Sequence, residues 1–168
     1  TSYFQELENS TGSRWCIKDP RLSLTIRDIY PFMPKPIRLL FNFRDPRPTV
    51  NHLAKERHWS RPSMTPGEAV TDAENEYYER NRSVLHFIGA HPDIDCLLVN
   101  YDDLVDGKLH GILDRFVGER INYTFIRPNE RKARPIEVSS NLTLLHSRML
   151  HLYERKLVAC VRNTRAVP

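Results

Sequence analysis

The sequence predicts an α/β fold with a largely parallel central sheet flanked by helices. Short, near-continuous apolar runs at 37–43 and 94–101 are typical of strands buried on both faces. Helical patterns separate these runs and follow them, which is the order that produces parallel strands. The length of 168 residues fits one domain.

Short stretches of sequence predict the first strands and helices of the chain. The run "RWCIK" at 14–18 predicts a buried strand that ends at Lys18, and 19–33 predicts a turn and a short helix before a proline-rich stretch. The apolar run 37–43 predicts the central strand. Asp45 followed by Pro46 then predicts a helix N-terminus, with the helix running to about position 56.

The clearest helix begins with Thr65 and Pro66, and Glu68 completes a capping box three residues after the threonine. Its apolar positions recur at helical spacing and predict one buried stripe: Val70, Ala73, Tyr77, Val84, Leu85 and Ile88. The polar stretch 55–64 before it is expected to be a mobile loop.

The rest of the chain alternates in the same way. We expect a buried strand at 94–101, an amphipathic helix at 109–118 stopped by Gly118, and a short extra strand at 122–126. A basic loop at 127–135 then leads to a last helix at about 140–162.

The charge balance suits an anionic ligand. The chain has 25 Lys and Arg against 21 Asp and Glu, a net charge of +4, which is too small and too dispersed to predict nucleic-acid binding. No apolar run is long enough to predict a membrane span.

Three cysteines make an odd number without a C-x-x-C pair. Cys16 and Cys96 lie in apolar runs, which favours buried free thiols and a cytoplasmic, reducing compartment. The alternative is the lumen of the secretory pathway, because four asparagines begin N-x-S/T sequons. One of them, Asn81, falls inside a predicted helix, which favours chance occurrence.

The candidate site follows from the strand ends. The carboxyl ends of parallel strands share one edge of a sheet, and ligands bind there. Lys18, Arg44 and Tyr101 each close a predicted strand. Arg44 also precedes a helix N-terminus, where a guanidinium and free backbone N–H groups together favour a phosphate. The alternative is a structural ion pair between Arg44 and Asp45 or Asp19.

Three segments in order, "IKDPRL", "LLFNFRDPRPTVNHL" and "LLVNYDDLVDGKLHGILDRFVG", resemble the sulfotransferase family across most of 14–120. The resemblance implies a P-loop NTPase-like sulfotransferase fold, of which this chain is the C-terminal part. It also implies transfer of sulfonate from 3′-phosphoadenosine 5′-phosphosulfate (PAPS) to a hydroxyl or amine on a small molecule, carbohydrate or lipid.

The resemblance implies cofactor contacts at three positions. Arg44 matches the arginine that binds the 3′-phosphate of PAPS. His52 stands where the family places a serine as second phosphate ligand, and its Nε2–H is able to donate to an anion. Tyr101 matches the tyrosine that contacts the adenine.

The resemblance assigns the remaining roles to basic residues. Lys18 matches the lysine near the transferred sulfonate and is the predicted catalytic residue. Arg131, Lys132 and Arg134 correspond to a late loop that closes over the 3′-phosphate. No metal-ligand spacing is present, and neither His52 nor His58 is a well-supported general base.

One family motif is missing. The G-x-x-R-S-G-T-type loop that holds the 5′-phosphosulfate has no counterpart here, so we expect it to precede Thr1 in a longer protein. The alternatives are a non-catalytic relative that binds a nucleotide or another anion, or serves as an interaction module, and a different P-loop-like enzyme such as a small kinase.

Overall fold

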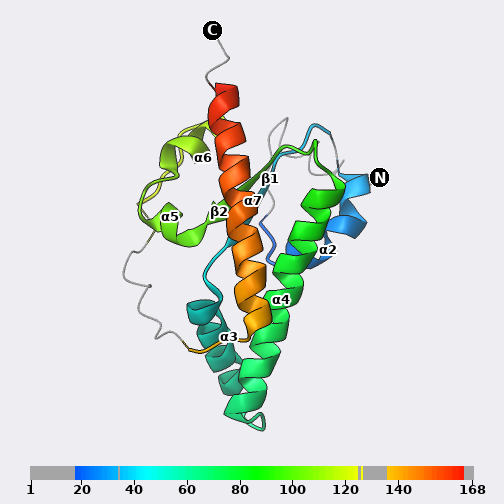
Figure 1. The fold of residues 1–168 in the computed structure, drawn as a ribbon, viewed down its shortest axis with the longest axis vertical. Helices are drawn as coiled ribbons and strands as arrows, with labels where there is room; N and C mark the ends of the chain where they lie inside the picture. Colours follow the sequence, from blue (N-terminus) through cyan, green and yellow to red (C-terminus); the bar gives the residue numbers. More distant parts are fainter. Residues whose placement is uncertain (1–17, 34, 125, 127–135, 165–168) are drawn as a thin grey trace, which may run out of the picture.

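The computed structural model describes residues 18–33, 35–124, 126 and 136–164. It shows an α/β arrangement, mostly helical, around a small parallel sheet of two strands. In Figure 1 the two long helices α4 (Pro66–Ala90) and α7 (Ser140–Thr164) run side by side along the long axis. The α/β class and the parallel strand pair predicted from the sequence are therefore confirmed.

The sheet consists of β1 (Leu39–Phe43) and β2 (Cys96–Asn100), paired in parallel from Leu39 opposite Cys96 to Phe43 opposite Asn100. Since both strands run the same way, both carboxyl ends lie at one edge of the sheet. We call this edge the carboxyl edge. Helices α3 (Pro46–Ser60) and α5 (Tyr101–Val105) begin there.

Helix α3 begins as predicted but ends later. The carboxylate of Asp45 caps it by accepting from the backbone N–H of Arg47. The helix continues through Ser60, so the mobile loop expected at 55–64 is wrong over its first six positions. The reason is Arg57, which forms ion pairs with Asp72 and Glu76 of α4 and holds the last turns of α3 against that helix.

Helix α4 confirms the capping box. The Thr65 hydroxyl accepts from the Glu68 N–H at 3.3 Å, and the Glu68 carboxylate accepts from the Thr65 N–H at 2.8 Å. The predicted stripe is largely confirmed, although Val70 and Leu85 are only partly buried. The fully buried positions of the helix are Ala69, Ala73, Tyr77, Val84, Phe87 and Ile88.

The shorter elements flank the sheet. Helix α2 (Leu22–Ile29) and the 3-10 turn η1 (Tyr30–Phe32) lie on one side, and α6 (His110–Val117) lies with α5 on the other (Figure 1). Gly118 ends α6 with φ +87°, which confirms the predicted stop.

Two further strands expected from the sequence are not found at the positions that the structure describes. The strand at 122–126 is wrong for the described positions 122–124 and 126, which form no strand. Tyr123 instead stacks its ring on His110 at 3.7 Å and donates its hydroxyl to Asp114, so this segment folds back onto α6. Of the strand expected at 14–18, positions 14–17 lie outside the described residues, and Lys18 is not in a strand.

Two hydrophobic clusters hold the elements together. The sheet cluster contains both strands with one face of α4 and the later part of α7, including Phe87 and Met149. The helix cluster joins α3, α4 and the first turns of α7 through Val50, Ala73 and Leu142. Helices α4 and α7 contribute to both clusters and so connect them.

Cys96 is buried in β2 as a free thiol, and burial raises its pKa, as expected of an unreactive core cysteine. Cys16 lies outside the described residues. Asn81 lies inside α4, as predicted, and its side-chain amide donates to the Tyr77 carbonyl at 2.8 Å. Among the described helices, none has the length and apolar content needed to cross a membrane.

Candidate functional site

The structure brings Arg44 and Tyr101 together at the carboxyl edge. Arg44 follows the last residue of β1, and Tyr101 follows the last residue of β2. The guanidinium carbon of Arg44 lies 4.6 Å from the centre of the Tyr101 ring, in the range of a cation–π contact. Their predicted proximity is therefore confirmed.

Three groups fix the position of Arg44. The Tyr101 ring supports the guanidinium, and Asp102 Oδ1 lies 3.8 Å from Arg44 Nε. On the backbone, the Arg44 carbonyl accepts a hydrogen bond of 2.6 Å from the hydroxyl of Tyr77 in α4. This buried tyrosine thereby connects the end of β1 to the middle of α4.

The Arg44 guanidinium retains unused hydrogen-bonding capacity. Its side chain is 21% exposed, and its Nε is buried without a hydrogen-bond partner among the described residues. Buried polar groups are normally hydrogen-bonded, so an unpaired N–H on a held guanidinium is energetically unfavourable. A guanidinium fork matches the geometry of a carboxylate or a phosphate.

The second arginine of the segment has a different role. Arg47 folds back onto Asp45, with Nη2 2.5 Å from Oδ2, and its hydrogen bonds hold the pKa of that carboxyl below its usual range. Asp19 and Arg21 form the same arrangement before α2. The structural alternative is therefore corrected in its partner: Asp45 pairs with Arg47 and Asp19 with Arg21, and the ion pair of Arg44 is with Asp102.

This arrangement also affects the N-terminus of α3. The Asp45 carboxylate accepts from the Arg47 backbone N–H at 2.8 Å, so a negative charge already occupies part of the helix end. The helix N-terminus consequently contributes less to anion binding than the sequence suggests.

The sequence reading missed His146. This residue lies on α7, with its ring centre 5.9 Å from that of Phe43, the neighbour of Arg44 in the chain. Its Nδ1 is buried without a hydrogen-bond partner in the described part of the chain. The sequence feature that could have identified His146 is its helical spacing from Leu142 and Met149, which are both buried.

The other predicted site residues have no contact with Arg44 or Tyr101 in the described part of the chain, or lie outside the described residues. Lys18 is exposed, and its charge helps to lower the pKa of the adjacent Asp19 carboxyl. His52 is exposed on α3, roughly 9 Å along the helix from its first residue, with Nε2 3.4 Å from Glu56 Oε1. Their predicted roles stay predictions. The loop residues assigned to the 3′-phosphate, Arg131, Lys132 and Arg134, lie outside the described residues.

A separate hollow lies beside α6. It has a volume of about 690 Å³, and its lining includes His110, Asp114 and Tyr123. These side chains are already engaged: the Tyr123 hydroxyl donates to Asp114, and His110 Nε2 lies 3.1 Å from the Leu104 carbonyl. In the described part of the chain, no three His, Cys, Asp or Glu side chains converge in a way that would hold a metal ion.

Comparison with known proteins gives no relative. No family model matches this chain, and neither a curated protein nor a solved structure does.

Proposed function

We propose that this chain carries the 3′-phosphate-binding part of a PAPS-dependent sulfotransferase. The observation that carries the proposal is Arg44, held over the Tyr101 ring where two parallel strands end, with its Nε 3.8 Å from Asp102 and without a hydrogen-bond partner among the described residues. The three ordered segments that resemble the family contain both residues. A P-loop-like sulfotransferase fold is part of this proposal.

Each residue then has a stated role. Arg44 binds the 3′-phosphate through two parallel N–H donors, and Tyr101 provides a surface for the adenine. Lys18 neutralises charge that develops on the sulfonate and on the leaving 5′-phosphate. His52 and the loop containing Arg131, Lys132 and Arg134 add further contacts to the phosphate. The acceptor hydroxyl or amine attacks sulfur and gives its proton to a base, while the bond from sulfur to the 5′-phosphate oxygen breaks and 3′-phosphoadenosine 5′-phosphate leaves.

A second candidate is a binding protein for a nucleotide or another anion that carries out no transfer. Two observations favour it. The Asp45 carboxylate places a negative charge at the helix end that would help bind phosphate, and Lys18 is exposed, with its charge acting on the adjacent Asp19 carboxylate. Both candidates require an anion at Arg44. They differ in whether sulfonate is transferred.

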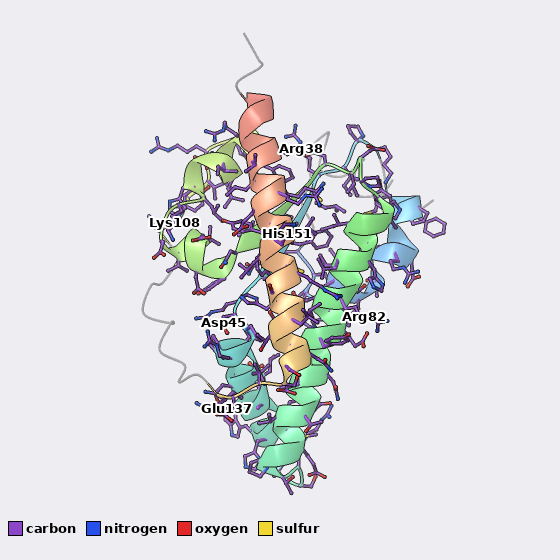
Figure 2. The ribbon with its side chains drawn as sticks, viewed as in Figure 1. Arg38, Asp45, Arg82, Lys108, Glu137 and His151 are labelled. Carbon is purple, nitrogen blue, oxygen red and sulfur yellow. The ribbon has the colours of Figure 1, made fainter. Side chains whose placement is uncertain are left out.

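Calorimetric titration with 3′-phosphoadenosine 5′-phosphate (PAP) tests the binding step. We expect micromolar-range binding that weakens at least about tenfold in Arg44→Ala, since a charge-assisted hydrogen bond contributes about 1.5–3 kcal/mol. Arg38→Ala is the matched control, because Arg38 stands immediately before β1 whereas Arg44 stands immediately after it (Figure 2). Arg38 pairs with Asp95 at the opposite end of the strand.

Titration with 5′-AMP separates the 3′-phosphate from the rest of the nucleotide. The wild-type chain should prefer PAP to 5′-AMP by about tenfold or more, and Arg44→Ala should lose that preference. An Arg38→Ala chain that loses it equally, or a wild-type chain that binds both nucleotides alike, contradicts the assignment of Arg44. A sulfonate-transfer assay then distinguishes the two candidates.

A further inference from the structure

Four asparagines of the chain begin N-x-S/T sequons, and the structure places the three that it describes in different surroundings. Asn81 lies in the interior of α4, and Asn141 lies in the first turn of α7. Asn122 is exposed, in the segment after α6 that is neither helix nor strand. The fourth, Asn9, lies outside the described residues. Because a glycan is bulky and occurs on surface loops, Asn122 is the described sequon whose position fits one.

Helix geometry separates the two groups that a sequon needs. Transfer of a glycan to asparagine requires a serine or threonine hydroxyl two residues later, and side chains two positions apart on a helix do not face each other. Asn81 is half-buried, and its amide donates to the Tyr77 carbonyl at 2.8 Å. After Asn141, the Thr143 hydroxyl donates to the Ser139 carbonyl at 3.5 Å. Neither helical sequon therefore presents its amide and its hydroxyl together.

The sequon at Asn122 holds the two groups together. The Thr124 hydroxyl donates to Asn122 Oδ1 at 2.7 Å, and the Thr124 backbone N–H donates to the same oxygen at 3.0 Å. Within the described residues, both hydrogen bonds of the Asn122 side chain are made at Oδ1, and its nitrogen Nδ2 makes none. A sugar attaches to an asparagine at Nδ2. Attachment at Asn122 therefore leaves the turn that the side chain forms with Thr124 intact.

The structure has space for a sugar beside this sequon. Asn122 and Thr124 line the hollow of about 690 Å³ next to α6. Asp114 and Arg120 also line it, which adds a carboxylate that accepts hydrogen bonds and a guanidinium that donates them. The hydroxyl and amide groups of a sugar are suited to both partners. The first sugar of a glycan on Asn122 therefore has room and polar partners in the hollow.

We propose that Asn122 is the N-glycosylation site of the described part of this chain. The reaction joins Asn122 Nδ2 to the anomeric carbon of the first sugar of a lipid-linked oligosaccharide diphosphate. The bond from that carbon to the diphosphate oxygen breaks, and the lipid diphosphate leaves with the bonding electrons. Nδ2 gives one proton to a base of the transferase, while Oδ1 keeps both hydrogen bonds to Thr124. The inference does not depend on the anion-binding role proposed for Arg44.

Glycosylation of Asn122 assigns the chain to the lumen of the secretory pathway, because proteins of that pathway carry glycans on asparagine. The cysteines of the sequence favoured a reducing compartment instead. Cys96, however, is buried in β2, and a buried thiol is shielded from oxidation and disulfide exchange in either compartment. This thiol therefore does not distinguish the two compartments, whereas a glycan on Asn122 does.

Peptide mass spectrometry tests the site on the chain expressed in eukaryotic cells behind a cleavable signal peptide. Peptide-N-glycosidase, used in water enriched in heavy oxygen, converts a glycosylated asparagine to a labelled aspartate. We expect the label at position 122 and not at 81 or 141. Thr124→Ala should lose this label, and Thr124→Ser, which keeps the hydroxyl, should retain it. Asn122→Gln should lower the intact mass by one glycan, whereas the control Asn81→Gln should not.

The same digestion of protein isolated from its source cells tests the compartment, and we expect the label at position 122 there too. Circular dichroism checks the variants, which should keep the wild-type helix content because Asn122 and Thr124 are exposed outside the helices. An unlabelled Asn122 in either sample, a label that survives in Thr124→Ala, or a label at Asn81 or Asn141 each overturns the inference. None of these results bears on the binding of PAP, so the proposed function fails or stands separately.

Discussion

Arg44 and Arg47 lie three residues apart and have different partners. Arg47 is paired with the capping carboxylate of Asp45, at 2.5 Å, and so stabilises the start of α3. Arg44 rests on the Tyr101 ring with its Nε 3.8 Å from Asp102, and this Nε has no hydrogen-bond partner among the described residues. The difference matters for function, since only an arginine whose donors are not already used by the protein has donors left for an anion.

Removing the Tyr77 hydroxyl should destabilise the chain. In Tyr77→Phe the Arg44 carbonyl loses its 2.6 Å hydrogen bond, which should lower the free energy of unfolding by about 1–2 kcal/mol in urea titrations. Tyr78→Phe is the control, because the Tyr78 hydroxyl has no hydrogen bond in the part of the chain that the structure describes. Equal losses in both variants would show that the bond to Arg44 contributes nothing.

Asp45→Asn separates the cap from its charge. Asparagine caps as well as aspartate, so the helix start should persist while the negative charge is lost, which should cost about 0.3–1 kcal/mol at pH 7. Because Arg47 lowers the folded pKa of Asp45, its charge stabilises the chain above the unfolded pKa of about 3.9. That contribution is lost as pH falls through the folded pKa.

Urea unfolding of wild type and Asp45→Asn at several pH values measures this difference. The gap between the two chains should be constant near neutral pH and should close below about pH 4. A gap that stays open at pH 2 would mean that the carboxylate acts through packing and not through its charge.

The contact between α3 and α4 depends on charge as well as on apolar packing. Arg57 pairs with Asp72 and Glu76 of α4, and its side chain is only 28% exposed. Arg57→Ala should therefore lower the free energy of unfolding by about 1–3 kcal/mol. Arg82→Ala, which removes an exposed pair with Glu79, should cost less than about 0.5 kcal/mol in the same assay.

A smaller loss for Arg57→Ala than for Arg82→Ala would contradict this account of α3. Circular dichroism gives an independent reading. If Arg57 holds the last turns of α3, helix content should fall in Arg57→Ala and not in Arg82→Ala.

Local chemistry decided which elements the sequence predicted well. The starts of α3 and α4 could be predicted from the sequence, because Asp45 and the pair Thr65 and Glu68 act within one helical turn. The end of α3 could not be predicted, because the residues that pair with Arg57 are 15 and 19 positions further along the chain. The strand expected at 122–126 failed for a similar reason: Tyr123 has a partner in Asp114 of α6 that strand propensity does not reveal.

At the scale of the whole molecule, α4 and α7 unite the sheet cluster and the helix cluster. Helix α7 also carries His146 to the carboxyl edge. The proximity of Arg44 and Tyr101 was predictable, because parallel strands end at one edge of a sheet. The position of His146 could not be predicted, because it depends on how α7 packs across the fold. The apolar periodicity of α7 does not determine that packing.

The packing of α7 can be tested with two leucines. Leu142 is 1% exposed in the helix cluster, and Leu142→Ala should lower the free energy of unfolding by about 2–5 kcal/mol. Leu144 is 54% exposed on the same helix, and Leu144→Ala should change it by less than about 0.5 kcal/mol. Similar values from urea titration would mean that the first turns of α7 do not pack as described.

The most direct test of the central claim is to observe the Nε–H signals of the arginines by NMR while PAP is added. The account predicts that the signal of Arg44, assigned with Arg44→Lys, shifts with PAP concentration and shifts little with 5′-AMP. The signal of Arg38, at the other end of β1, should stay in place. PAP binding that leaves the Arg44 signal unchanged would contradict the claim that Arg44 recognises the 3′-phosphate.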